Sequence, residues 1–311
     1  MRTWNLIVRF FISLLLILFL LWKIDFQPVF ELLKDISILG IILSFLFYLL
    51  TYVIITSRWY FILKYQGLDV HFPKLFSLYM VGFFFNNFVP SGIGGDVFRC
   101  IYISRGTKKG ELFTASVITE RLLGLIATLL IAIIFIPFSE FPSNIKYSVL
   151  LLSIGLIIVI LLPILPYTNI IFRKICRIIP GNKIRNFTEQ TIHSLSLFKS
   201  EALLYGFVFS ILYQTGLITF FYFVGLSLGL NVSIINYLAF LPIVWIIGLI
   251  PISINAIGIR EAGFAGMFAA LGLDSSIGFS NSLIGFVISV IASLPGGIFF
   301  ILMGKGKDET G

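Results

Sequence analysis

Long runs without a charged residue constrain this chain more than any other feature. No Asp, Glu, Lys or Arg occurs between Asp35 and Arg58, and none occurs from Ala202 to Ile259. A bilayer core of ~30 Å is crossed by roughly 20 helical residues. In lipid the backbone must satisfy its own hydrogen bonds, so such runs predict transmembrane helices. We therefore expect an all-α polytopic membrane protein.

The composition agrees with this interpretation. Hydrophobic residues make up 59% of the chain and charged residues 12%, and the mean hydropathy is +1.06. Lys and Arg exceed Asp and Glu by 22 to 14. Positive charge between apolar spans is what membrane orientation requires, and no basic segment is large enough for a folded nucleic-acid reader. Cys100 and Cys176 indicate neither a disulfide framework nor a metal site, and no cofactor is expected.

The uncharged runs predict about six full transmembrane helices. The N-terminal run lacks a small-x-small cleavage site, so we interpret it as a retained first helix rather than a signal peptide. The expected helices lie between Arg9 and Lys23, between Asp35 and Arg58, and at roughly 113–137, 147–166, 202–225 and 279–303.

One further run, FVPSGIGGDVFR from Phe88 to Arg99, is interrupted by a proline and three glycines. If it crossed the bilayer, the basic residues that follow it would face outward, against the positive-inside rule. A segment that returns to the side from which it entered avoids this. We expect a re-entrant hairpin over about 72–105 with its tip near Pro90 to Gly95; a kinked full span is the alternative.

A second interrupted segment covers about 233–273 and contains Pro242, Pro251, Asn255 and Gly258. We expect it to be a hairpin that enters from the opposite side. Both termini then lie in the cytoplasm. The only cations outside would be Lys23, Lys34 and Lys146, and those within the membrane would be Arg121 and Arg260.

Each half of the chain then contains helix, helix, broken hairpin and helix. The first half-repeat is 1–137 and the second is 138–311. Three crossings per half is an odd number, so the halves must have opposite orientations. Inverted repeats with discontinuous helices place the binding sites of many transporters at the middle of the membrane.

The hairpin tips are candidate ligand sites. Irregular backbone at membrane depth is tolerated where it lines a cavity or is buried in protein, and helix N-termini favour anions such as phosphate. The alternative for the glycines is close helix packing. The candidate tip residues are Ser91, Gly92, Gly94, Gly95 and Asn255.

Glu120 and Arg121 stand well inside a predicted helix, where each charge costs at least ~2.5 kcal/mol and needs a partner. The charged residues of the two hairpins are the expected partners. One hypothesis is a polar cavity in which arginines hold a phosphate; the alternative is a structural charge network. Arg99 also fits an ordinary cytoplasmic flank. The candidate charged residues are Asp96, Arg99, Glu120, Arg121, Arg260 and Glu261.

Three motifs carry a resemblance to a known family. PSGIGGDVFR from Pro90, ERLLGL from Glu120 and GIREAG from Gly258 resemble the lysylphosphatidylglycerol synthase transmembrane-region family over about 6–303. The resemblance implies a polytopic fold that moves or flips a polar-headed lipid. The synthases carry a soluble transferase domain after the membrane part, and this chain ends at Gly311 without one, so synthesis of lysyl lipid is not expected.

The leading hypothesis is therefore a lipid translocase in the cell membrane. No Gly-Lys-Ser/Thr nucleotide loop follows the glycines, so direction would come from an ion gradient, or transport would be downhill. The alternatives are a membrane transferase acting on a lipid-linked substrate, with an acidic residue as base, and a non-catalytic partner of a separate lipid synthase. The expected partner is an anionic membrane lipid. The sequence leaves open whether the protein forms a homodimer.

Overall fold

The computed structural model describes residues 34, 36–88, 94–105, 107, 109–161, 190, 198–250 and 256–305. Throughout these residues the regular structure is helical, and none of them forms a strand. The expected helix between Arg9 and Lys23 and most of the basic loop at 167–201 lie outside the described residues.

Five stretches of the described chain are long and apolar enough to cross a membrane. Their outer surfaces carry large aliphatic side chains; Leu151, for example, is 71% exposed. Such exposure suits hydrocarbon rather than water. The all-α polytopic membrane fold is confirmed. These stretches comprise α3 (Ile38–Tyr65), α6 (Gly110–Phe135) with the 3₁₀ turn η1 (Ile136–Phe138), α7 (Ser143–Leu161), α10 (Ser200–Ser227), and α13 (Ser275–Ser293) with α14 (Pro295–Lys305).

The last predicted helix is two helices in the structure. We expected one helix over 279–303, but α13 ends at Ser293 and α14 begins at Pro295. Leu294 keeps helical dihedral angles, but Pro295 has no N–H to donate to a carbonyl oxygen of the preceding turn and is well suited to the first position of a new helix. The chain therefore restarts at Pro295, and α14 packs against α4 (Phe72–Phe88).

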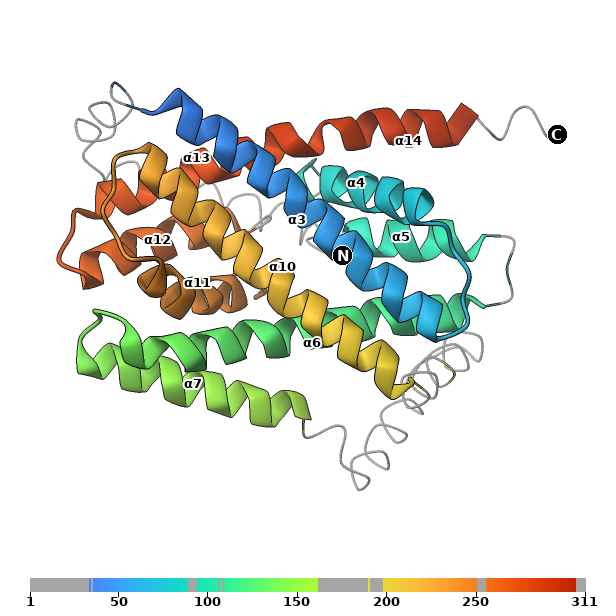
Figure 1. Cartoon of the computed structure of the whole chain (residues 1–311), viewed down its shortest axis with the longest axis horizontal. Coiled ribbons are helices and arrows are strands. Elements are labelled where there is room, and N and C mark those ends of the chain that lie inside the picture. Colours follow the sequence, from blue (N-terminus) through green and yellow to red (C-terminus); the bar gives the residue numbers. More distant parts are fainter. Residues whose placement is uncertain are drawn as a thin grey trace, which may run out of the picture.

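Four shorter helices form the two interrupted segments. The first pair is α4 with α5 (Gly94–Ser104), and the second is α11 (Ile234–Gly248) with α12 (Ile259–Ala270). The members of each pair pack against each other, and each helix is shorter than the roughly 20 residues that a bilayer requires. Figure 1 shows the two pairs at opposite ends of the bundle, with α3 and α10 running side by side across its front.

The helix contacts come in matched sets. If α3, α4, α5 and α6 are exchanged with α10, α11, α12 and α13, each contact maps onto another contact: α3–α4 onto α10–α11, α5–α6 onto α12–α13, and α4–α13 onto α11–α6. The α3–α10 contact maps onto itself. This pattern supports an inverted repeat, while its division at residues 137 and 138 stays a prediction.

The contact between α3 and α10, which lie side by side, joins the two halves. At the start of α3, the Ser37 amide donates to the Ser227 carbonyl oxygen at 2.8 Å. A Cβ added at Gly40 would lie 2.7 Å from the Ser227 Cβ. Small residues at this end of the helix pair let the two backbones approach closely, as is common in membrane helices.

Candidate functional site

A buried ion pair joins α3 to α6. The Arg58 Nη2 atom lies 2.6 Å from Glu120 Oε1, and Arg58 Nε lies 3.0 Å from the same oxygen. The Glu120 side chain is 0% exposed. Because a lone charge in a medium of low dielectric is costly, each of these groups requires the other. Arg58 Nη1 also donates to Ser210 Oγ of α10 at 3.3 Å.

Glu120 also contacts the first hairpin. The Tyr79 hydroxyl of α4 donates to Glu120 Oε1, and Arg99 Nη1 of α5 lies 3.4 Å from Glu120 Oε2. Helices α3, α4 and α5 therefore all reach one carboxylate on α6. We infer that Glu120 positions the hairpin against the long helices.

Asp96 is the second carboxylate at this place. It is the third residue of α5, so its side chain lies one turn from Arg99. Arg99 Nη2 lies 2.5 Å from Asp96 Oδ1, and Arg121 Nη2 lies 2.5 Å from Asp96 Oδ2. Neighbouring residues on a helix point about 100° apart, which lets Glu120 and Arg121 take different partners. The structure thus brings together four of the expected charged residues.

Two aromatic rings hold Arg99. Its guanidinium carbon lies 3.9 Å from the centre of the Tyr79 ring and 4.7 Å from that of Trp59. A cation over such rings is stabilised by their negative faces, most strongly when water is excluded. Trp59 is itself fixed, because its Nε1 donates to Ser116 Oγ at 2.9 Å. Arg99 is therefore buried and held by two acids and two aromatic rings, unlike an exposed residue that flanks a helix.

We call Arg58, Asp96, Arg99, Glu120 and Arg121 the arginine cluster. Three cations face two carboxylates, which leaves one net positive charge. The Arg121 side chain is 51% exposed, whereas the other four are at most 11% exposed. The excess charge suits an anion rather than a metal ion, and no three possible metal-ligating His, Cys, Asp or Glu side chains group together in the described chain.

The second hairpin has its own ion pair. Arg260 pairs with Glu261 of the same helix, and Arg260 Nε lies 3.2 Å from Ser282 Oγ of α13. Arg260 and Arg121 take different ion-pair partners in the described chain, and the hypothesis that they share one cavity stays a prediction. Glu261 also caps α12: its Oε2 accepts from the Gly258 amide at 2.6 Å, which holds the carboxylate beside Arg260.

In the described part of the first hairpin tip, the backbone amide of Gly95 is hydrogen-bonded within the protein. The Gly95 amide donates to Asn86 Oδ1 at 2.9 Å, and a Cβ on Gly95 would clash with the Gly82 carbonyl oxygen. Gly95 therefore serves close packing of α4 on α5, the alternative that the sequence left open. Gly94 begins α5. Three other candidates, Ser91, Gly92 and Asn255, lie outside the described residues.

Sequence reasoning missed several members of this site. Arg58 was assigned to a cytoplasmic flank because it follows an uncharged run, yet α3 continues to Tyr65. The signal was present, since the apolar stretch WYFIL directly follows Arg58. Tyr79 and Ser210 are uncharged residues in apolar segments, so nothing in the sequence distinguishes them from the other polar residues of those segments.

Comparisons with known proteins give a consistent picture. The profile of the family described as "Lysylphosphatidylglycerol synthase TM region" matches residues 6–297. The chain is 26% identical to UPF0104 membrane protein PH1989 of Pyrococcus horikoshii, over 93% of this chain and 95% of that one. It is 27% identical to UPF0104 membrane protein MJ1595 of Methanocaldococcus jannaschii, over 96% and 95%. No solved structure matches.

Proposed function

Because the chain belongs to the family of lysylphosphatidylglycerol synthase transmembrane regions, we propose that it moves a polar-headed lipid between the leaflets of the cell membrane. The substrate would be a phospholipid or a lipid-linked precursor with an anionic group. One observation carries this proposal: the arginine cluster has an excess positive charge, and only Arg121 of its members is widely exposed.

The depth of Arg121 suits a passing headgroup. It lies eleven positions after Gly110, where α6 begins, or about 16 Å along the helix at 1.5 Å per residue. A cation at that depth in a membrane helix is costly and is commonly retained for function. An anionic headgroup that reaches it gains a favourable partner inside the bilayer, while the acyl tails stay in lipid.

The ion pairs make Arg121 the arginine that can change partner. If Arg121 turns from Asp96 to a phosphate, Asp96 keeps Arg99 at 2.5 Å and Glu120 keeps Arg58 at 2.6 Å. Neither buried carboxylate is left unpaired. A guanidinium can hold a phosphate through two parallel hydrogen bonds. In this proposal Arg121 binds the headgroup, and Arg58 and Arg99 position the acids.

We further propose that both termini lie in the cytoplasm and that the two halves form an inverted repeat. The matched helix contacts support the repeat. The positive-inside rule supports the orientation. The headgroup would then pass between the two hairpins as the halves rock against each other, in the manner of other inverted-repeat transporters.

The test is lipid movement in proteoliposomes that contain a fluorescent anionic phospholipid. Arg121→Gln should slow transfer between leaflets roughly tenfold or more, because a hydrogen bond to a charged group contributes ~1.5–3 kcal/mol. Lys199→Gln is the matched control, since it removes one exposed positive charge at the start of α10. Transfer by Arg121→Gln at the wild-type rate would argue against the site.

A further inference from the structure

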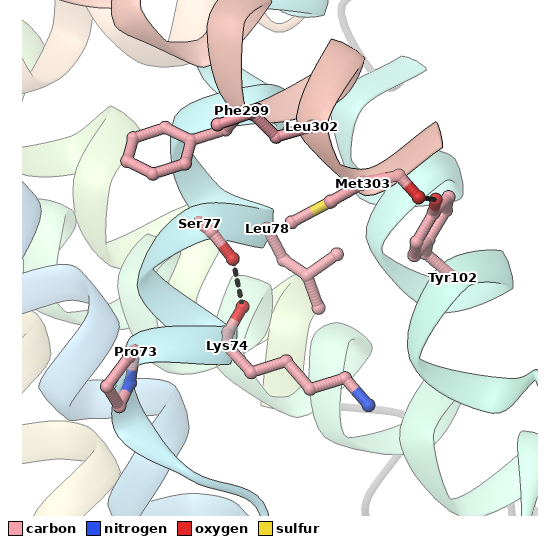
Figure 2. Close-up of a pocket in the computed structure, with 8 residues that line it drawn as sticks. All are labelled: Pro73, Lys74, Ser77, Leu78, Tyr102, Phe299, Leu302 and Met303. Carbon is pink, nitrogen blue, oxygen red and sulfur yellow. Dashed lines mark hydrogen bonds between the residues drawn. The ribbon is translucent and has the colours of Figure 1, made fainter. Parts of the chain in front are cut away.

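A groove separate from the arginine cluster lies between α4, α5 and α14. Its volume is about 480 Å³. Apolar side chains of α4 and α14 form its floor, with Leu78, Phe299 and Leu302 among them. Figure 2 shows Lys74 extending along one edge of the groove and Tyr102 at another.

The groove lies where three helix ends meet. Lys74 is the third residue of α4, and Tyr102 is two residues from the end of α5. The Tyr102 hydroxyl donates to the carbonyl oxygen of Met303, near the end of α14, at 3.0 Å. The groove therefore lies at the edge of the helix bundle. Because α14 ends a stretch long enough to cross a membrane, this edge suits the headgroup region.

Two exposed cations lie at this edge of the groove. Lys74 is exposed and has no ion-pair partner among the described residues. The Arg105 guanidinium carbon lies 4.4 Å from the centre of the Tyr102 ring, which adds a second exposed cation beside the groove. Basic residues next to an apolar surface at the membrane interface attract anionic lipids by ~1 kcal/mol each.

We propose that this groove binds one anionic glycerophospholipid that is not transported. Its phosphate contacts Lys74, and one acyl chain lies on Leu78, Phe299 and Leu302. Because the floor belongs to α4 and α14, the bound lipid joins α14 to the first hairpin and stabilises the folded chain. The translocation site is the arginine cluster, so this site is independent of the proposed transport.

Thermal unfolding of the full chain in detergent tests the proposal. Added phosphatidylglycerol should raise the wild-type melting temperature, and phosphatidylcholine should raise it less, because a ligand that binds only the folded state stabilises it by mass action. Lys74→Ala should weaken phosphatidylglycerol binding about fivefold, as expected for one interfacial lysine, and should lose most of the shift. Lys64→Ala, an exposed lysine in the last turn of α3, should keep it.

A second variant tests the groove without altering charge. Ser77→Phe places a ring in the groove and should also abolish the shift. Native mass spectrometry should show one retained phosphatidylglycerol on the wild type and on Lys64→Ala, and fewer on the other two variants. Equal shifts with both lipids, a shift that persists in Lys74→Ala, or a wild type that does not respond would each overturn the proposal. Lack of response would mean that another part of the chain fills the groove. Inorganic phosphate alone should have no effect.

Discussion

Arg58 and Glu120 are 62 residues apart in the sequence and form an ion pair of 2.6 Å between α3 and α6, with both side chains almost completely buried. Glu120 also accepts a hydrogen bond from the Tyr79 hydroxyl and lies beside Arg99. The pair therefore does more than neutralise two charges. It links the long helices to the hairpin that carries Asp96, and Asp96 in turn holds Arg121.

Removing Arg58 should destabilise the fold strongly. Arg58→Ala leaves buried Glu120 with the more distant Arg99 as its ion-pair partner in the described chain, and breaking a buried pair costs ~3–5 kcal/mol. We expect a large drop in the melting temperature in detergent. Lys199→Ala, which removes an exposed charge, should change it little. Equal melting temperatures for these two variants would mean that the pair contributes little to stability.

Neutralising Asp96 should strengthen headgroup binding. Asp96→Asn removes the carboxylate that competes for Arg121 and raises the net charge of the arginine cluster from +1 to +2. Binding of an anionic phospholipid should tighten about five- to thirtyfold, or by ~1–2 kcal/mol, as expected for a charge-assisted contact. Native mass spectrometry with mixed anionic and zwitterionic lipids measures this. If the variant binds as weakly as Arg121→Gln, Asp96 belongs to the binding site itself and is not a competitor.

Gly95 should tolerate no side chain. A methyl group there clashes with the Gly82 carbonyl of α4, and overpacking of this kind typically costs 1–3 kcal/mol. Gly95→Ala should lower the melting temperature. Gly155→Ala on α7 is the control, because a Cβ there meets no atom within 4 Å and alanine favours the helix. An unchanged Gly95→Ala protein would mean that α4 and α5 are not in close contact.

Glu261 has two functions that substitution can separate. Glu261→Gln keeps an oxygen that can accept from the Gly258 amide but loses the ion pair with Arg260, whereas Glu261→Ala loses both. Loss of a helix cap costs ~1 kcal/mol. Melting temperatures should therefore fall in the order wild type, glutamine, alanine. If both variants have the same melting temperature, the hydrogen bond to the Gly258 amide adds no stability beyond that of the ion pair.

Much of the fold followed from charge-free runs, because a helix in lipid must be long, apolar and hydrogen-bonded within itself. As the proline- and glycine-containing tips predicted, α4 ends at Phe88 and α5 begins at Gly94, and α11 ends at Gly248 and α12 begins at Ile259. The sequence also indicated that Asp96 and Arg99 accompany Glu120 and Arg121. These predictions depend on properties that each segment has on its own.

The partners of Glu120 depend on tertiary packing, which the sequence does not display. Arg58 follows an uncharged run, so charge counting places it at the membrane surface, although α3 continues past it. Arg260 was an expected counterpart of Glu120 and Arg121, but its ion-pair partner among the described residues is Glu261, which caps α12. The partner of Arg58 is thus selected by the packing of two long helices, and the partner of Arg260 by a local cap.

The most direct test of the central claim is leaflet transfer by the wild-type protein itself. Proteoliposomes would carry a fluorescent anionic phospholipid in both leaflets, and a membrane-impermeant reductant would quench the outer leaflet. Our account predicts that quenching continues past the outer-leaflet fraction, as inner-leaflet lipid arrives at the outside. Quenching that stops at the level of protein-free vesicles, with the protein folded and inserted, would contradict it.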